Sequence, residues 1–168
     1  LKRYKPSTIH DMMLMALNKG DERLYLMHPM TRLTISDAEE IATLMREANP
    51  EFWAEITSDR ITTSMEDMLW LGLRDKEQLL SVGNTRLTDF GCNIGIVATH
   101  KSHRNKGYAT TIVSALLKEI FQKSEVALIH VLRDNLPARH VYEKVGFKPY
   151  ATYFFMKGGK RRTPNNQQ

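Results

Sequence analysis

The chain has 168 residues, of which 42% are hydrophobic and 26% charged, and its 24 lysines and arginines outnumber its 19 aspartates and glutamates to give a net charge of +5. This length favours one domain with its own core, and no apolar run approaches the roughly 18 residues of a membrane-spanning helix. The first residues lack the apolar core of a signal peptide, and the single cysteine, Cys92, excludes an internal disulfide. We therefore expect a cytoplasmic protein with no membrane partner.

The excess positive charge is concentrated near the two ends of the chain and in one central loop. Its residues are Lys2, Arg3, Lys5, Lys101, Arg104, Lys106, Lys157, Lys160, Arg161 and Arg162. Such charge suits a nucleic acid or a polyanionic cofactor equally well. No arginine-rich run alternates with aromatic residues, so nucleic-acid binding has only charge in its favour. No zinc-ligand spacing occurs, and we expect no metal.

Residues 1–28 predict an N-terminal extension formed by a helix and a short strand. Apolar residues recur with helical spacing between residues 8 and 19, and Gly20 would end the helix. These residues are Ile9, Met12, Met13, Ala16 and Leu17. Residues 24–28 indicate the strand. Because the chain starts with leucine, the extension could be part of a longer protein.

Two helices and a hairpin are predicted next. Residues 36–48 and 58–68 show helical periodicity, and each run begins at polar residues that can cap it. Residues 69–74 and 79–87 have the composition of two strands, and the polar residues 75–78 would join them in a hairpin.

The stretch from Asn93 to Leu117 predicts a strand, a basic loop and an amphipathic helix that continues to about residue 122. The loop reads Arg104, Asn105, Lys106, Gly107, Tyr108 and Ala109. The first backbone N–H groups of a helix have no partner within it and attract anions. Gly107 would let the backbone approach a ligand closely. The loop is therefore either a phosphate site or an ordinary basic surface turn.

A second pattern follows the apolar strand at 126–132. It has the form N-x-x-A-x-x-x-Y-x-x-x-G-F and consists of Asn135, Ala138, Tyr142, Gly146 and Phe147. Asn135 can cap a helix that Gly146 would end. Tyr142 is either a functional phenol or a core aromatic residue at helical spacing, and Asn135 is either a ligand-binding residue or a cap alone.

Together, the R-x-x-G-x-A motif and the Asn…Tyr…Gly-Phe run resemble the GNAT superfamily of acyl-CoA-dependent N-acetyltransferases, over residues 93–155. The resemblance implies an α/β (α+β) fold: a mixed, mostly antiparallel sheet of six or seven strands, helices on both faces, and a splayed cleft at the central strand. It places the domain at residues 29–157, ahead of a disordered basic tail at 158–168. The helices within 36–68 would border the acceptor site.

The resemblance also implies acetyl-CoA as the acyl donor. Its pyrophosphate would lie on the 104–109 loop, and its pantetheine arm would pair with the backbone of the central strand. An N–H group of Ala98 or Thr99 would polarise the thioester carbonyl. Hydroxyl groups of Thr110 and Thr111 could add donors. The implied cofactor-binding residues are Val97, Ala98, Thr99, Arg104, Asn105, Lys106, Gly107, Tyr108, Ala109, Thr110 and Asn135.

Tyr142 is the implied catalytic acid, because a phenol with a pKa near ~10 is protonated at neutral pH and can donate to a leaving thiolate. The base is not identified, since Asn93 stands where some family members carry a glutamate. Glu47, Glu66, Asp89, His100 and His130 are the candidates by reach. An unassisted lysine, neutral roughly once in 2500 molecules at pH 7, is disfavoured relative to an α-amine, neutral about once in ten.

The predicted activity is transfer of an acetyl group from acetyl-CoA to a primary amine, on a small molecule or a protein, by direct attack in a ternary complex. No acyl-enzyme is expected, because no nucleophile with a base partner is visible. The alternative is a non-catalytic acyl-CoA-binding regulatory module. Nucleic-acid binding through the basic ends is a third and weaker hypothesis. The acceptor and the oligomeric state are open, and a homodimer is compatible with the sequence.

Overall fold

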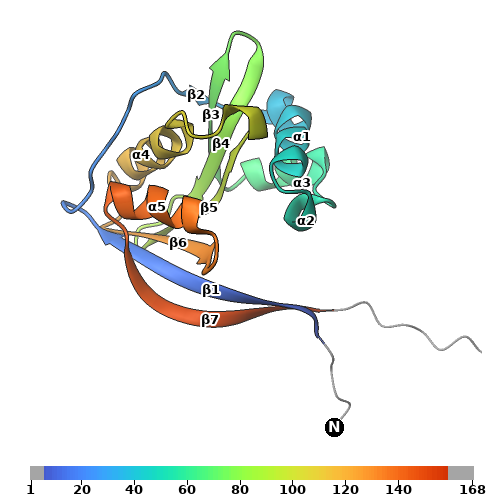
Figure 1. Cartoon of the computed structure of the whole chain (residues 1–168). Coiled ribbons are helices and arrows are strands. Elements are labelled where there is room, and N and C mark those ends of the chain that lie inside the picture. Colours follow the sequence, from blue (N-terminus) through green and yellow to red (C-terminus); the bar gives the residue numbers. More distant parts are fainter. Residues whose placement is uncertain (1–5, 159–168) are drawn as a thin grey trace, which may run out of the picture.

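The computed structural model describes residues 6–158, so the predicted tail lies, apart from Gly158, outside the described residues (Figure 1). The strands are β1 (Pro6–Asn18), β2 (Thr31–Arg32), β3 (Leu69–Asp75), β4 (Gln78–Arg86), β5 (Cys92–Thr99), β6 (Val126–Leu132) and β7 (Lys148–Gly158). The helices are α1 (Ala38–Ala48), α2 (Pro50–Trp53), α3 (Ser58–Met65), α4 (Tyr108–Ile120) and α5 (Leu136–Val145). No helix in residues 6–158 is both long and apolar enough to span a bilayer.

The strands form one seven-stranded sheet in the order β2-β3-β4-β5-β6-β1-β7. Every neighbouring pair runs antiparallel except β5 and β6, which run parallel. The parallel pair is joined through α4, as a parallel connection requires a crossover. The predicted mixed, mostly antiparallel sheet with helices on both faces is therefore confirmed.

The N-terminal segment differs from the prediction, because residues 6–18 form a strand inside the sheet rather than a helix. β1 pairs with β6 on one side and with β7 on the other, in a register that sets Leu14 opposite both His130 and Ala151. Met13, Met15 and Leu17 are all buried, which follows the two-residue period of a strand. Residues 24–28, predicted as a strand, belong to the connection between β1 and β2.

The two faces of the sheet are covered unequally (Figure 1). On the face covered by α4 and α5, the α4 face, one core runs across the sheet and includes residues of β1, β3, β4, β5 and β6. On the opposite face, the α1 face, a second core joins α1 and α3 to buried side chains of β3, β4 and β5. Among the described residues, this second core contains none from β6, β1 or β7. That half of the α1 face is therefore covered by no helical core, and its contact with the helices is made by His10 of β1, whose ring meets that of Phe52 of α2 at 5.9 Å between centroids.

The helices begin and end close to the predicted positions. α1 and α3 lie within the predicted helical segments, and the Thr57 hydroxyl caps α3 by accepting from the Arg60 N–H. Asn49 ends α1 as predicted, and its side chain then caps the short helix α2 by accepting from the Phe52 N–H at 3.3 Å. α5 ends at Gly146, whose φ of +115° lies in the left-handed region. The glycine signal at the end of α5 therefore acts as expected, whereas Asp37 precedes α1 without a side-chain capping bond and Thr57 caps α3 one residue before the predicted start.

Gly146→Ala is expected to destabilise the fold by about 2–4 kcal/mol in chemical denaturation. A side chain costs about 1 kcal/mol at positive φ, and a Cβ here would also lie 2.7 Å from the backbone oxygen of Asp21. Gly20→Ala is the matched control, since Gly20 has a φ of +96° and open space around its Cα, and should lose only about 1 kcal/mol. Equal decreases in the free energy of unfolding of the two variants would show that the contact with Asp21 does not affect stability.

Candidate functional site

The centre of the sheet contains a gap where β5 and β6 part. The two strands pair over three residues only, and the last pair is Ile94 with Ile129. Both strands then continue, β5 to Thr99 and β6 to Leu132. At the same point β5 has a bulge, because Thr85 pairs with Ile94 and the preceding Asn84 pairs with Ile96. The bulge lies at Gly95, at the vertex of the gap.

The backbone of β5 beyond the bulge presents hydrogen-bonding groups to this gap. The N–H group of His100 donates to the Leu80 oxygen of β4 at 2.8 Å. Facing direction alternates along an antiparallel ladder, so Ala98 also faces β4, and its oxygen accepts from the buried Ser81 hydroxyl at 3.0 Å. Val97 and Thr99 therefore direct their N–H and C=O groups toward the gap. Of the two predicted carbonyl-polarising residues, Thr99 faces the gap and Ala98 faces β4.

The predicted phosphate loop leads from β5 into α4 on the α4 face. Asn105 and Gly107 adopt left-handed φ values of 61° and 80°, and Gly107 is the residue before the first turn of α4. Loops with such residues can turn successive N–H groups inward around an anion. Tyr108, Ala109 and Thr110 form the first turn, where N–H groups lack helical partners. The loop has the backbone form of an anion site.

The connection between β1 and β2 lies against this loop, which the sequence did not indicate. His28 contacts the Lys106 carbonyl oxygen at 3.3 Å, and its ring meets that of Tyr108 edge-on at 4.8 Å between centroids. A Cβ on Gly107 would lie 2.6 Å from the terminal carbon of Met27. Met27 and His28 thus form one side of the loop.

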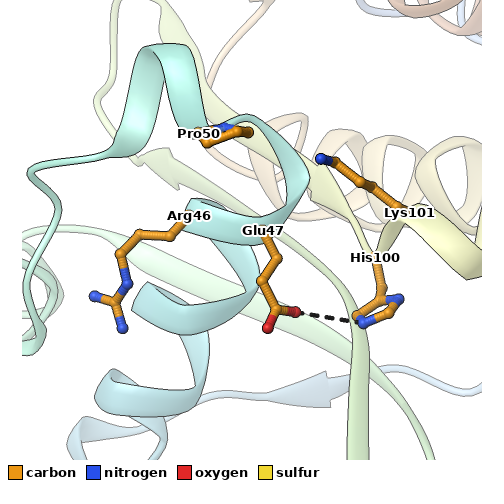
Figure 2. A pocket seen from close by; sticks show the side chains of 5 residues that line it. All are labelled: Arg46, Glu47, Pro50, His100 and Lys101. Carbon is orange, nitrogen blue, oxygen red and sulfur yellow. Dashed lines mark ion pairs between the residues drawn. The ribbon is translucent and has the colours of Figure 1, made fainter.

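Two side-chain contacts tie the far end of β5 to the end of α1. The Arg104 guanidinium donates to the carbonyl oxygen of Ala48, the last residue of α1, at 2.7 Å. His100 Nε2 lies 3.4 Å from a Glu47 carboxylate oxygen, and Figure 2 shows these side chains pointing toward one another. An open cavity of about 470 Å³ lies beside them, lined by Arg46, Glu47, Pro50, His100 and Lys101. The Arg104 side chain is thus engaged with α1.

Tyr142 lies in α5, which packs beside α4 on the same face (Figure 1). Its side chain is 6% exposed, and its ring meets that of Phe147 at 6.2 Å between centroids. Burial raises the pKa of the Tyr142 hydroxyl, which therefore stays protonated at neutral pH. Asn135 caps α5, since its side-chain oxygen accepts from the Ala138 N–H at 3.3 Å. The structure therefore shows Asn135 as a helix cap.

The candidate bases occupy different places around the gap. Asp89 and Glu66 are exposed, at the turns that follow β4 and α3. Glu47 and His100 lie at the far end of β5, beside the phosphate loop. His130 is the first β6 residue after the last pair with β5, and its Nδ1 is 2.6 Å from the Tyr153 hydroxyl oxygen.

Three features of the site were not foreseen. The bulge at Gly95 could have been suspected from a glycine inside an apolar strand. No local signal predicts the contact of Tyr153 with His130 or the contact of Met27 with the loop, because each joins residues far apart in the sequence. Asn93, at the position of the family glutamate, carries a buried side-chain oxygen without a hydrogen-bond partner among the described residues.

Residues 70–156 match the model of the family described as FR47-like protein. The chain belongs to the FR47-like family. It is 27% identical over 82 residues to YobR of Bacillus subtilis (strain 168), described as an uncharacterized N-acetyltransferase. That alignment covers 48% of this chain and 33% of YobR, so the chain matches only about a third of this curated relative.

Solved structures share the fold of this FR47-like chain. A putative GNAT-family acetyltransferase from Novosphingobium aromaticivorans DSM 12444 superposes with a TM-score of 0.76 at 17% identity, covering 93% of this chain and 68% of that one. The PaiA N-acetyltransferase from Thermoplasma acidophilum, solved in complex with coenzyme A, has a TM-score of 0.65 at 17% identity, covering 78% and 98%. The predicted resemblance to the GNAT superfamily is thus confirmed at the level of the fold.

Arg104→Ala is expected to lower the free energy of unfolding by about 1 kcal/mol, because the Ala48 carbonyl at the end of α1 loses its charged donor. Lys106→Ala removes a neighbouring exposed cation and should change stability by less than about 0.5 kcal/mol. Urea unfolding of both variants measures the difference. An unchanged midpoint for Arg104→Ala would mean that this contact does not hold α1 to the loop.

Proposed function

We propose that this chain is an acetyltransferase that binds acetyl-CoA in the gap between β5 and β6 and transfers the acetyl group to a primary amine. The observation that carries the proposal is the gap itself. It exposes the backbone groups of Val97 and Thr99 and leads to an anion-binding loop at the start of α4. An extended ligand with amide groups and a polyanionic end fits both parts at once.

The loop residues have different roles in holding the pyrophosphate. Backbone N–H groups of Tyr108, Ala109 and Thr110 begin α4 and favour an anion through the helix dipole. Lys106 adds a positive charge at the same turn. Arg104 acts mainly by fixing the loop against α1, since its guanidinium donates to Ala48. The pantetheine arm pairs with Val97 and Thr99 as an added strand would.

The comparisons support this assignment. The Thermoplasma acidophilum PaiA N-acetyltransferase has this fold and was solved with coenzyme A, and YobR is described as an N-acetyltransferase. Each similarity is distant, so the donor and the reaction of this chain are inferred from its own residues. The gap and the loop suit acetyl-CoA, and the phenol of Tyr142 can donate a proton to its leaving thiolate.

Tyr142 supplies the proton for the leaving thiolate. Its hydroxyl has no hydrogen-bond partner among the described residues, and its raised pKa keeps it protonated at neutral pH, so that it can donate to the sulfur as negative charge develops there. The N–H group of Val97, two residues beyond the bulge at Gly95, faces the gap and can stabilise the developing negative charge on the carbonyl oxygen. Tyr142 belongs to the core of the α4 face, against which Val97 of β5 packs.

Direct attack by the amine is favoured over an acyl-enzyme. Cys92, the single cysteine, is completely buried in the core of the α4 face. Its sulfur lies 3.3 Å from both the N–H and the carbonyl oxygen of Thr88, in the turn before β5. A thiol in that position cannot reach a thioester in the gap without unfolding the strand. The amine therefore attacks the bound acetyl-CoA itself.

Isothermal titration calorimetry with acetyl-CoA is expected to show saturable binding to the wild-type chain. Acetyl-CoA binding without acetylation of any amine in a broad panel would favour the non-catalytic regulatory module. Asn93 is the observation that supports this module, because its buried amide cannot act as a base. Absence of binding heat up to millimolar concentrations of acetyl-CoA would exclude both the acetyltransferase and the non-catalytic acyl-CoA-binding module.

Tyr142→Phe is expected to lower kcat by about 10²- to 10⁴-fold, the usual contribution of a positioned acid, while the Kd for acetyl-CoA stays within about twofold. The fold should be unaffected, because the hydroxyl has no partner to lose. Tyr150→Phe is the control, since Tyr150 is 76% exposed and lies outside the gap. Turnover of Tyr142→Phe at the wild-type rate would exclude the phenol from the reaction.

A further inference from the structure

The gap between β5 and β6 opens differently on the two faces of the sheet. On the α4 face, α4 and α5 pack over it and form the main core with both strands (Figure 1). On the α1 face, the helices α1 and α3 cover β3, β4 and β5, and the described part of β6, β1 and β7 contributes nothing to their core. An acceptor can therefore approach a thioester in the gap from the α1 face, over β6.

His130 stands on that open face at the vertex of the gap. Its neighbours in the strand, Ile129 and Val131, are 2% and 4% exposed and belong to the core of the α4 face. Side chains alternate along a strand, so His130 projects from the opposite face, where it is exposed. The pairing of β5 with β6 ends at Ile129, one residue before it.

A hydrogen bond fixes the imidazole of His130. The Tyr153 hydroxyl of β7 reaches across β1 to Nδ1 at 2.6 Å, above Leu14, which pairs with His130 in β1. If Nδ1 carries the ring proton and donates it to the phenol oxygen, Nε2 retains a lone pair directed away from Tyr153. Desolvation lowers the pKa of His130, so the ring is neutral near pH 7.

The remaining candidate bases are less suited to this position. Glu47 and His100 pair with each other at the far end of β5, five residues beyond the bulge at Gly95. A strand rises about 3.3 Å per residue, so this pair lies roughly 16 Å along β5 from the vertex. It adjoins the phosphate loop, where a base has no proton to remove.

We propose that His130, oriented by Tyr153, is the general base that receives the proton of the acceptor amine on the open α1 face. This inference rests on the proposed acetyltransferase function and adds the side from which the acceptor enters. Acid and base then lie on opposite faces of the gap, with Tyr142 on the cofactor side and His130 on the acceptor side.

The proton balance of the step is complete. The amine nitrogen bonds to the thioester carbonyl carbon and gives one proton to Nε2 of His130. The carbon–sulfur bond breaks, and the sulfur takes a proton from the Tyr142 hydroxyl. Exchange with water returns the proton from His130 to Tyr142. One proton has then moved from nitrogen to sulfur, and both side chains are restored.

The test compares His130→Gln with His140→Gln, the same change at an exposed histidine of α5 on the other face. Acceptors are phenylethylamine, an aliphatic polyamine and a peptide with a free α-amine, with acetyl-CoA as donor. His130→Gln should lower kcat/KM for the best acceptor at least about 100-fold. The Kd for acetyl-CoA should stay within twofold, and added imidazole should restore part of the rate. His140→Gln should match the wild type.

Two further measurements separate catalysis from structure. Hydroxylamine, which is largely unprotonated at neutral pH, should lose much less rate in His130→Gln than phenylethylamine does. Tyr153→Phe should lower kcat about tenfold with the KM for the amine within twofold, because Tyr153 acts only on the imidazole. Wild-type turnover in His130→Gln would overturn this inference alone. A wild-type chain that binds no acetyl-CoA would overturn it together with the proposed function.

Discussion

The early end of the pairing between β5 and β6 is the constraint on which the rest of the site depends. Backbone N–H and C=O groups need partners, and β5 beyond Ile94 has them on one side only. Each strand is held apart by its other neighbour. β4 pairs with β5 as far as Thr99, and β1 pairs with β6 as far as Leu132. The gap is therefore a fixed feature of the sheet, and a ligand with a peptide-like arm can complete it.

The unequal cover of the two faces turns this gap into a site with two sides. α4 and α5 bring the proposed phosphate-binding loop and the protonated Tyr142 to one face. The opposite face, free of helices over β6, carries the neutral imidazole of His130. Donor and acceptor can thus meet through the sheet, each from its own side. The contact of Arg104 with Ala48 fixes the loop on which this arrangement depends.

Local sequence signals predicted much of the fold, including the loop that leads from β5 into α4. Gly146 predicted the end of α5 and Asn135 predicted a cap, and both occur as expected. The left-handed φ of Gly107 at the start of α4 was not predicted. The location of β1 could not be foreseen, because an apolar segment such as residues 8–19 satisfies helical and strand periods alike. Only its pairing with β6 and β7, more than a hundred residues away, decides between them. The pair of His130 and Tyr153 depends on the same pairing and was equally beyond local reasoning.

Amide hydrogen exchange, resolved by residue with NMR, tests the central claim most directly. Val97 and Thr99 direct their N–H groups into the gap, whereas Ala98 between them faces β4. Saturating acetyl-CoA should slow exchange at Val97 and Thr99 at least about tenfold and leave Ala98 nearly unchanged, because the bound arm pairs with one edge of β5 only. Binding of acetyl-CoA with unchanged exchange at both Val97 and Thr99 would contradict the account.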